Sequence, residues 1–346
     1  MDSPKIAIFI DTTLSASEFM GFHHRDNSYC ELILFYKELS SLGFKIFWNP
    51  PPSMTCYEFL FVYNSHVDLL HYSYISSFLV VLETPFYAAR IYNPSYWKSF
   101  HYIFSWNKDY FSTHKGFSFL PYSVLFSDDH FGISNRKQAI AAIFSSHQFD
   151  GINEGYLLRH QVISYFDDNK VDMSFHLYGM GWDSRLYPPA LNRYNSLIRR
   201  KFPLIYRTLP KSSLPPNYKG KVQSKSTVLQ RYCFSFCCEN NFNMNDYVTE
   251  KIWDSLVSGC IPIYKGPPNV YDYFNDDIFI NISRFDSLDN LFSYVVSLSE
   301  EEIATYQSNI ASFVSGSSGG KFDHHNMLKL FLAKKHIQPK DSWRFL

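Results

Sequence analysis

Short apolar runs alternate with longer amphipathic segments along the first 135 residues of the chain. Apolar runs of about four to eight residues bounded by turn residues indicate buried strands, and apolar positions three or four apart indicate helices. The pattern predicts one helix over Cys30–Leu42 and strands over Lys5–Ile10, Phe44–Trp48, Phe59–Tyr63, Ser77–Leu82, Tyr102–Ser105 and Phe117–Leu120. This alternation is typical of stacked βαβ units and predicts one Rossmann-like domain.

The second half of the chain repeats the alternation after a polar stretch, 127–137. Predicted helices lie near Tyr156–Phe166 and over Ser226–Gln230, Asp246–Val257, Leu288–Leu298 and Glu300–Val314. Predicted strands are Ala139–Ser145, Ser174–Tyr178, Cys233–Cys237, Ile261–Tyr264 and Phe279–Ile282. The segment Tyr187–Lys219 carries six prolines and is predicted to be an irregular connection. We therefore expect an α/β GT-B fold, in which two Rossmann-like domains, 1–136 and 137–325, face a central cleft and a tail follows at 326–346.

Composition limits the classes of partner. Hydrophobic residues make up 46% of the 346 residues and charged residues 18%, so each half can bury a core. Lysine plus arginine equals aspartate plus glutamate at 32 each, which gives the chain no general attraction to nucleic acid or anionic lipid. We expect no nucleic-acid partner.

The cysteines and the apolar segments bear on location. No two of the six cysteines have C-x-x-C spacing, and buried, reduced thiols are expected. The N-terminal segment lacks the features of a signal peptide, and no apolar run reaches the roughly 18 residues of a membrane-spanning helix. These features predict a cytoplasmic protein without a transmembrane anchor. The tail mixes cations with aromatic residues (Lys334, Lys335, Trp343, Arg344, Phe345), which favours a tail that docks on the protein and gives at most peripheral membrane contact.

The segment with the most chemical information joins a predicted strand to a predicted helix. The strand ends in the polar pair Glu239–Asn240, and Asp246 is a predicted N-cap of the helix that follows. Such a junction is where α/β sheets bind phosphates. If a helix begins at Asp246, one of its faces carries Tyr247, Glu250 and Lys251. Their phenol, carboxylate and ammonium groups suit a ribose and a diphosphate. The spacing of these residues alone favours an ordinary solvent-exposed first helical turn over a nucleotide site.

The order of residues across this region resembles a known family. Phe234 and Glu239–Asn240 are followed by Asp246–Lys251, Ser258–Cys260 and Ile261–Pro267. This arrangement closely resembles the signature of the α1,3-fucosyltransferases, glycosyltransferase family 10. The resemblance places Glu250 on the ribose of a GDP-sugar, Lys251 on its diphosphate and Tyr247 beside them, and Glu239 and Asn240 match the Glu-Asn pair of the family.

Two shorter matches occur in the family's order. Arg159 lies where the family has a helical arginine that neutralises the leaving diphosphate, and Val80–Pro85 resembles the strand that ends in the family's probable general base, here Glu83. Leu120–Tyr122 resembles the strand-Pro-Tyr segment that closes the first domain. The resemblance covers roughly residues 75–290 and leaves the first 70 unmatched.

Together these matches predict an inverting transferase that uses GDP-fucose as donor and an acceptor glycan, with N-acetylglucosamine in an α1,3 linkage as the family's usual target. Glu83 is the expected base, and Arg159 and Lys251 the expected cations at the diphosphate. No cofactor or metal is expected, and the acidic pairs Asp128–Asp129, Asp167–Asp168 and Asp276–Asp277 are interpreted as solvated loops. A GT-B transferase with another nucleotide sugar or a protein acceptor is the alternative, and a nucleotide-sugar-binding protein without turnover ranks below it.

Overall fold

The computed structural model describes residues 6–10, 30–51, 53–122, 135–145, 154–168, 171–182, 201, 214–316, 322 and 325–335. Contacts divide the chain into two compact units: the first comprises Met1–Phe126, Asn245–Glu250 and Ser318–Leu346, and the second comprises Ser127–Met244 and Lys251–Ser317. The acidic pair Asp128–Asp129, residues 187–200 and 202–213 of the predicted irregular connection, and Trp343, Arg344 and Phe345 lie outside the described residues.

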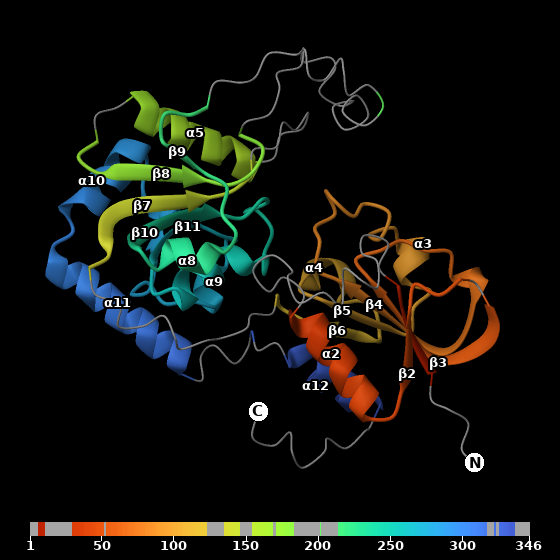
Figure 1. Ribbon diagram of the computed structural model, residues 1–346. Helices are drawn as coiled ribbons and strands as arrows, with labels where there is room; N and C mark the ends of the chain where they lie inside the picture. The colour runs from red at the N-terminus through yellow and green to blue at the C-terminus, as the bar shows by residue number, and fades with distance from the viewer. Residues whose placement is uncertain are drawn as a thin grey trace. The chain divides into compact units, whose positions relative to one another are not determined.

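The first unit is built on a parallel sheet with the strand order β2-β1-β3-β4-β5-β6 (Figure 1). Its strands are β1 Ile6–Ile10, β2 Lys45–Trp48, β3 Ser53–Tyr63, β4 Tyr72–Val81, β5 Tyr102–Ser105 and β6 Phe117–Phe119. The helical elements are α2 Cys30–Ser41, the 3-10 turn η2 Leu69–His71, α3 Pro94–Trp97, α4 Lys108–Phe111 and α12 Asn326–Lys335. The short inner strands β1 and β5 are largely buried apolar runs, because neighbours cover a parallel sheet on both sides, whereas β6, at the edge of the sheet, is half-buried.

The core of the first unit is largely aromatic. The ring of Phe331 on α12 lies 5.2–5.6 Å from four rings, those of Phe35, Phe59, Phe61 and Phe78. A second cluster joins buried residues of α3 to Leu60, Val62 and Leu79 of the sheet. The part of the predicted tail that the structure describes is thus a helix that packs in the core, where sequence analysis assigned no helix.

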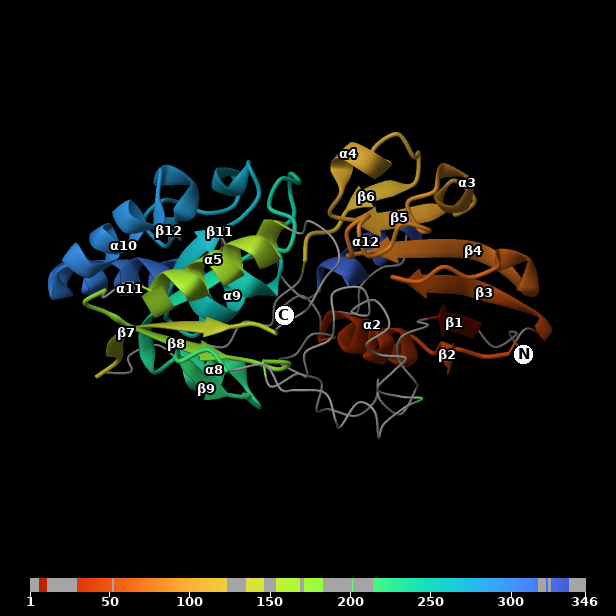
Figure 2. The same ribbon diagram turned by 90° about the horizontal axis from the view of Figure 1, so that it is seen from above.

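The second unit holds another parallel sheet, with the order β12-β11-β10-β7-β8-β9 (Figure 2). Its strands are β7 Lys137–Ile143, β8 Ser174–Tyr178, β9 Tyr218–Gly220, β10 Tyr232–Cys238, β11 Ile261–Lys265 and β12 Ile280–Asn281. Its helical elements are α5 Glu154–Asp168, α8 Lys225–Leu229, α9 Glu250–Val257, η4 Val270–Asp272, η5 Ile282–Arg284, α10 Leu288–Ser297 and α11 Glu300–Ser315. The two predicted Rossmann-like sheets are therefore confirmed.

Several predicted elements differ from the structure. Strand β9 lies at the end of the segment predicted to be irregular, and β3 and β4 begin five or six residues earlier than predicted, at Ser53 and Tyr72. The predicted strand Phe279–Ile282 shortens to β12, because η5 begins at Ile282. The early parts of β3 and β4 contain polar and exposed positions, which hid them from a search for apolar runs.

The largest difference concerns the start of α9, which is Glu250 and not Asp246. Asp246 has a φ of 64°, in the left-handed region that an α-helix excludes, so its predicted role as an N-cap is wrong. Aspartate is one of the few residues other than glycine that enter this region readily. Tyr247 therefore precedes the helix and does not share a helical face with Glu250 and Lys251.

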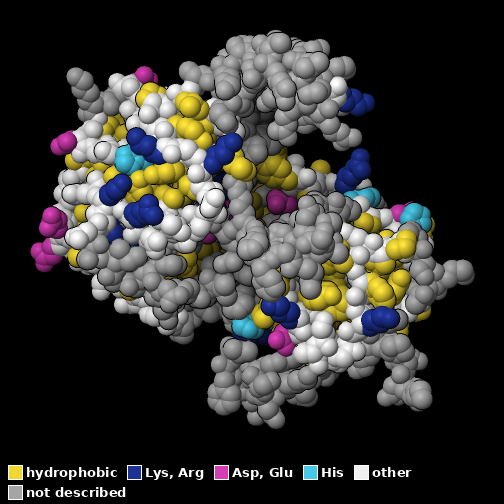
Figure 3. Space-filling model, in the orientation of Figure 1, with side chains coloured by type: hydrophobic (Ala, Val, Ile, Leu, Met, Phe, Trp, Pro, Cys, Tyr) yellow, Lys and Arg dark blue, Asp and Glu magenta, His cyan; other side chains and the backbone are white. Residues whose placement is uncertain are grey.

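The described helices and surface bear on contact with membranes and charged partners. No described helix is both long and apolar enough to cross a membrane. On the face in Figure 3, described lysine and arginine side chains are scattered and do not form one continuous patch.

The five cysteines with described side chains are free, and Cys233, Cys238 and Cys260 are buried as expected. Cys56 is exposed, which corrects the expectation of burial for that residue.

Candidate functional site

The carboxyl end of β10 forms the centre of a polar cluster in the second unit. Parallel α/β sheets bind their ligands beyond the carboxyl ends of the strands, where Glu239 and Asn240 follow β10 directly. The first turn of α5 approaches closely, because the Gly155 amide donates to the Asn240 carbonyl at 3.1 Å. A Cβ atom at position 155 would lie 2.1 Å from the Glu239 carbonyl oxygen, so only glycine permits this approach.

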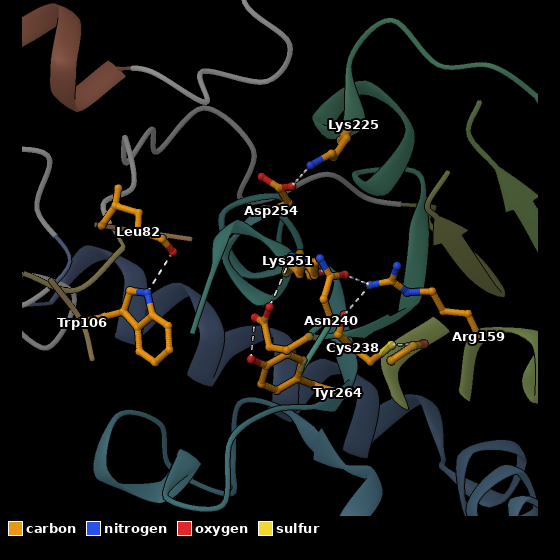
Figure 4. A network of polar contacts seen from close by, with 12 residues as sticks. Leu82, Trp106, Arg159, Lys225, Cys238, Asn240, Lys251, Asp254 and Tyr264 are labelled. Carbon is orange, nitrogen blue, oxygen red and sulfur yellow. Dashed lines mark hydrogen bonds and ion pairs between the residues drawn. The ribbon is translucent and has the colours of Figure 1, made fainter. Parts of the chain in front are cut away.

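Arg159, one turn further along α5, reaches the same strand end (Figure 4). Its Nη2 donates to the Cys238 carbonyl and to Asn240 Oδ1, both at 2.9 Å. The guanidinium lies 4.7 Å from the ring of Tyr156, within cation–π range. Burial lowers the pKa of Arg159, but Cys238, Tyr156 and Glu239 more than offset it and the net shift is upward. The site therefore contains a permanent, buried positive charge whose Nε has no hydrogen-bond partner among the described residues.

Glu239 joins a second cation to the same strand end. Its carboxylate is 0% exposed and accepts a hydrogen bond from the Tyr264 hydroxyl at 2.9 Å, while Lys251 Nζ lies 3.3 Å from its other oxygen. Burial and the neighbouring Glu239 raise the pKa of Tyr264 well above its usual value, so this phenol stays a donor. Glu239 is thus enclosed by protein, whereas Lys251, 19% exposed, and the half-buried Asn240 reach solvent.

Tyr264 was not predicted from sequence, although a signal was available. In the register of β10 and β11, Tyr264 pairs with Cys237, two residues before Glu239. A tyrosine near the carboxyl end of a strand adjacent to β10 is therefore placed to meet a side chain that follows β10.

In the first unit, Glu83 follows β4, and three side chains form hydrogen bonds with the backbone at this point. Asn64 Oδ1 accepts hydrogen bonds from the amides of Leu82 and Glu83 at 2.7 and 3.2 Å. Trp106 Nε1 donates to the Leu82 carbonyl at 2.9 Å, and the Tyr92 hydroxyl donates to the Glu83 carbonyl at 2.8 Å. The side chain of Glu83 is half-buried. Because hydrogen bonds fix this backbone, the Glu83 carboxylate suits a role in which it must be held in a defined position against a reacting group.

Tyr247 and Glu250 are grouped with the first unit. The buried ring of Tyr247 lies 4.7 Å from that of Trp106, and Asp246 forms an ion pair with Lys108 at 3.4 Å. Burial first, and then the charges of Glu250, Tyr63, Glu83 and Tyr247, raise the pKa of Tyr122 well above its usual value.

The predicted site residues thus fall into two groups. One group meets at the end of β10 in the second unit and consists of Arg159, Glu239, Asn240 and Lys251. The other belongs to the first unit and consists of Glu83, Tyr247 and Glu250, each of which interacts electrostatically with Tyr122. The acidic pairs that the structure describes lie elsewhere: Asp167 accepts a hydrogen bond from Asn217 at 3.1 Å, and Asp276 pairs with Arg284 at 3.2 Å. Across the described ranges, no group of three or more histidine, cysteine, aspartate or glutamate side chains is arranged to hold a metal ion.

Part of this chain is similar in sequence to a known family of proteins. Residues 211–309 match the profile described as glycosyltransferase family 10 (fucosyltransferase), C-terminal. An α-(1,3)-fucosyltransferase of Helicobacter pylori is 40% identical over 74 residues, which cover 21% of this chain and 15% of that protein. A GDP-fucose protein O-fucosyltransferase 3 of Xenopus laevis is 27% identical over 147 residues, 42% of this chain and 29% of its own. These matches therefore span less than a third of either relative.

The fold has a wider match than the sequence. A crystal structure of an α1,3-fucosyltransferase aligns with 98% of this chain and 92% of its own, with a TM-score of 0.56 and 14% identity. Likeness at this identity concerns the fold, and with the two parallel sheets it confirms the predicted GT-B class.

Proposed function

We propose that this chain, whose residues 211–309 match the C-terminal model of glycosyltransferase family 10 (fucosyltransferase), transfers fucose from GDP-fucose to a hydroxyl of an acceptor glycan. The observation that carries the proposal is the cation pair at the end of β10. Arg159 and Lys251 are held there by Cys238, Asn240 and Glu239. These three residues and Lys251 lie within the matched segment, whereas Arg159 lies on α5, outside it.

The donor contacts follow from the charges. Arg159 and Lys251 stabilise the negative charge that builds on the diphosphate as the bond to the sugar breaks. Asn240 orients the guanidinium, and Glu239 with Tyr264 orients the ammonium, so Glu239 acts on the donor through Lys251. Glu250 binds the ribose, and Tyr247 packs beside the nucleotide.

The acceptor chemistry is assigned to the first unit. Glu83 removes the proton of the attacking hydroxyl, and attack on the face opposite the leaving GDP inverts the anomeric centre. The preferred acceptor is N-acetylglucosamine in an α1,3 linkage, as in N-acetyllactosamine. No step uses a metal.

A protein acceptor is the second candidate, since the Xenopus relative is named as a protein O-fucosyltransferase. The first 70 residues, which lie outside the family match, belong to the unit with Glu83 and bear on this choice. A protein that binds nucleotide sugars without turnover ranks lower, because a carboxylate and both cations are present.

The donor is tested by isothermal titration of the purified protein with GDP and with UDP, followed by product analysis with GDP-fucose and N-acetyllactosamine. The proposal expects GDP to bind at least tenfold more tightly than UDP, a difference of about 1.4 kcal/mol, and fucosylated product to form. Tighter binding of UDP would overturn the fucose assignment. Binding of GDP-fucose with transfer only to a protein acceptor would favour the second candidate.

A further inference from the structure

The pairing of β4 with its neighbouring strands ends before Glu83. The ladders with β3 and β5 end at Val81 or before it, and the next residue, Leu82, is buried. Buried backbone groups need hydrogen-bond partners, and side chains supply them here. Asn64 Oδ1 accepts from the amides of Leu82 and Glu83, and Trp106 Nε1 donates to the carbonyl between them. These side chains therefore fix the course of the chain at the proposed base.

Asn64 suits its position for two separate reasons. Its φ of 44° lies in the left-handed region, which asparagine enters more readily than most residues. Its amide donates to the Val80 carbonyl at 2.9 Å, and its side-chain oxygen meets the two amides further along the same strand end. A glycine would keep this backbone conformation and lose the acceptor. The two properties can therefore be separated by mutation.

Trp106 is a side chain that serves two segments. It follows β5 and is 1% exposed, and its indole N–H donates to the Leu82 carbonyl at 2.9 Å (Figure 4). Its ring lies 4.7 Å from the ring of Tyr247, which is also buried. Leu82 directly precedes Glu83, and Tyr247 lies in the segment 245–250. One buried side chain thus contacts both the segment of the proposed base and a segment of the proposed nucleotide contacts.

A second contact holds the segment 245–250. Lys108, two residues after Trp106, pairs with buried Asp246 at 3.4 Å, and its ammonium lies 4.0 Å from the ring of Phe119. Trp106 and Lys108 therefore both attach this segment to the first unit, to which its residues are assigned. Trp106 differs from Lys108 in that it also bonds to the backbone that carries the proposed base.

From this arrangement we propose that Trp106 is a positioning residue for both parts of the reaction. Its indole N–H holds the backbone of the base Glu83, and its ring holds Tyr247 beside the nucleotide. Asn64 positions the base alone. The inference rests on the proposed function for the roles of Glu83 and Tyr247. The two contacts of Trp106 are separable, because Trp106→Phe keeps a ring for Tyr247 and removes the N–H, whereas Trp106→Leu removes both.

The test is the steady-state transfer of fucose from GDP-fucose to N-acetyllactosamine, with kcat referred to the fraction of protein that binds GDP. Asn64→Gly and Trp106→Phe are expected to lower kcat about 10- to 100-fold, because a misplaced reacting group loses rate on that scale, with an unchanged KM for GDP-fucose. Trp106→Leu is expected to lower kcat similarly and also to raise that KM about fivefold, the loss of one aromatic pair. A purely structural role would lower the amount of folded protein without this division between kcat and KM.

Trp97→Phe is the matched control, because Trp97 is another buried tryptophan of the first unit and its Nε1 has no hydrogen-bond partner among the described residues. The substitution removes ring volume and no described hydrogen bond of the side chain, so kcat and KM should stay at wild-type values. Wild-type kcat in Asn64→Gly or in Trp106→Phe, or an equal loss in Trp97→Phe, would overturn the proposal. An unchanged KM for GDP-fucose in Trp106→Leu would overturn the shared role of Trp106.

Hydrogen exchange of backbone amides, followed by mass spectrometry, reads the same contacts without turnover. Asn64→Gly should speed exchange at the amides of Leu82 and Glu83. Trp106→Leu should speed exchange in the peptide that covers 245–250, and Trp106→Phe should not. If these changes occur in a protein that transfers no fucose, the anchoring contacts stand and the proposed function fails. Unchanged exchange in both peptides would overturn the anchoring itself.

Discussion

Two charged side chains among the described residues of the second unit, Arg159 and Glu239, are buried, and neighbours hydrogen-bond to both, although Arg159 Nε has no partner among the described residues. Burial of an unpaired charge costs several kcal/mol, so such side chains persist where hydrogen bonds and opposite charges compensate. Arg159 has two acceptors on one nitrogen, and Glu239 has a phenol and an ammonium. The stability of these buried charges and the proposed donor binding therefore depend on the same contacts.

Replacement of Arg159 by lysine tests this arrangement. A lysine keeps the charge but not the planar fork that rests on Tyr156 and bonds to Cys238 and Asn240. We expect the free energy of unfolding to fall by about 1–3 kcal/mol, and the affinity for GDP to fall at least tenfold, a loss of about 1.4 kcal/mol. Urea denaturation and calorimetric titration measure the two effects. Arg231→Lys, at an exposed arginine just before β10, is the control, and an equal loss there would contradict the account.

The cysteines give a second prediction at the residue scale. Burial raises the pKa of Cys233 and of Cys238, and raises that of Cys260 to about 12. A raised pKa lowers the thiolate fraction at pH 8, and the thiolate is the reactive species. We expect these three thiols to resist a thiol-specific reagent at pH 8 in the native protein, and exposed Cys56 to react within minutes.

Peptide mapping by mass spectrometry identifies the modified positions in that experiment. Cys56→Ser should remove the fast reaction at this position, and 6 M guanidinium chloride should make the other three react. Fast labelling of Cys260 in the native protein would show that its burial is wrong.

Among the elements, α12 has the clearest effect on stability. Its Phe331 lies among four aromatic rings, and Lys335 Nζ donates to Ser76 at 2.7 Å while lying 5.0 Å from the ring of Phe59. Burial lowers the pKa of Lys335. The helix thus belongs to the core of the first unit although more than 190 residues separate it from the last strand of that sheet.

Phe331→Ala is expected to destabilise the first unit by about 3–5 kcal/mol, the usual cost of removing a buried phenylalanine ring. Thermal unfolding followed by circular dichroism measures the loss. Lys329→Ala changes the exposed face of the same helix and should have an effect below about 0.5 kcal/mol. A small loss at Phe331, comparable with that at Lys329, would contradict the packing of α12.

The elements also show how far sequence reasoning extends. Tyr102–Ser105 and Ser174–Tyr178 have the predicted bounds. The first is an almost fully buried apolar run, and in the second buried Phe175 and Leu177 alternate with more exposed positions, and both patterns are local signals of a strand. The start of α9 was missed because an aspartate suits both an N-cap and the left-handed backbone that Asp246 adopts. Helix α12 and the burial of Glu239 by Tyr264 depend on contacts between distant segments, which no local pattern contains.

On the scale of the whole molecule, the residues proposed for the reaction come from both compact units. Glu83, Tyr247 and Glu250 belong to the first, and Arg159, Asn240 and Lys251 to the second. Glu250 and Lys251 are neighbours in the chain yet are assigned to different units, so α9 begins where one unit passes into the other. The proposed base Glu83 and the cations Arg159 and Lys251 are therefore separable by mutation, because the contacts that hold Glu83 lie within the first unit and those that hold the two cations lie within the second.

The most direct test of the central claim is the steady-state transfer of fucose from GDP-fucose to N-acetyllactosamine by wild type, Glu83→Gln and Lys251→Ala, with surface Glu301→Gln as control. Glu83→Gln should lower kcat about 100-fold or more, the usual contribution of a general base, with an unchanged KM for GDP-fucose. Lys251→Ala should raise that KM at least tenfold, because it removes a charge-assisted contact worth about 1.5–3 kcal/mol. Wild-type kcat in Glu83→Gln, or unchanged donor KM in Lys251→Ala, would contradict the account.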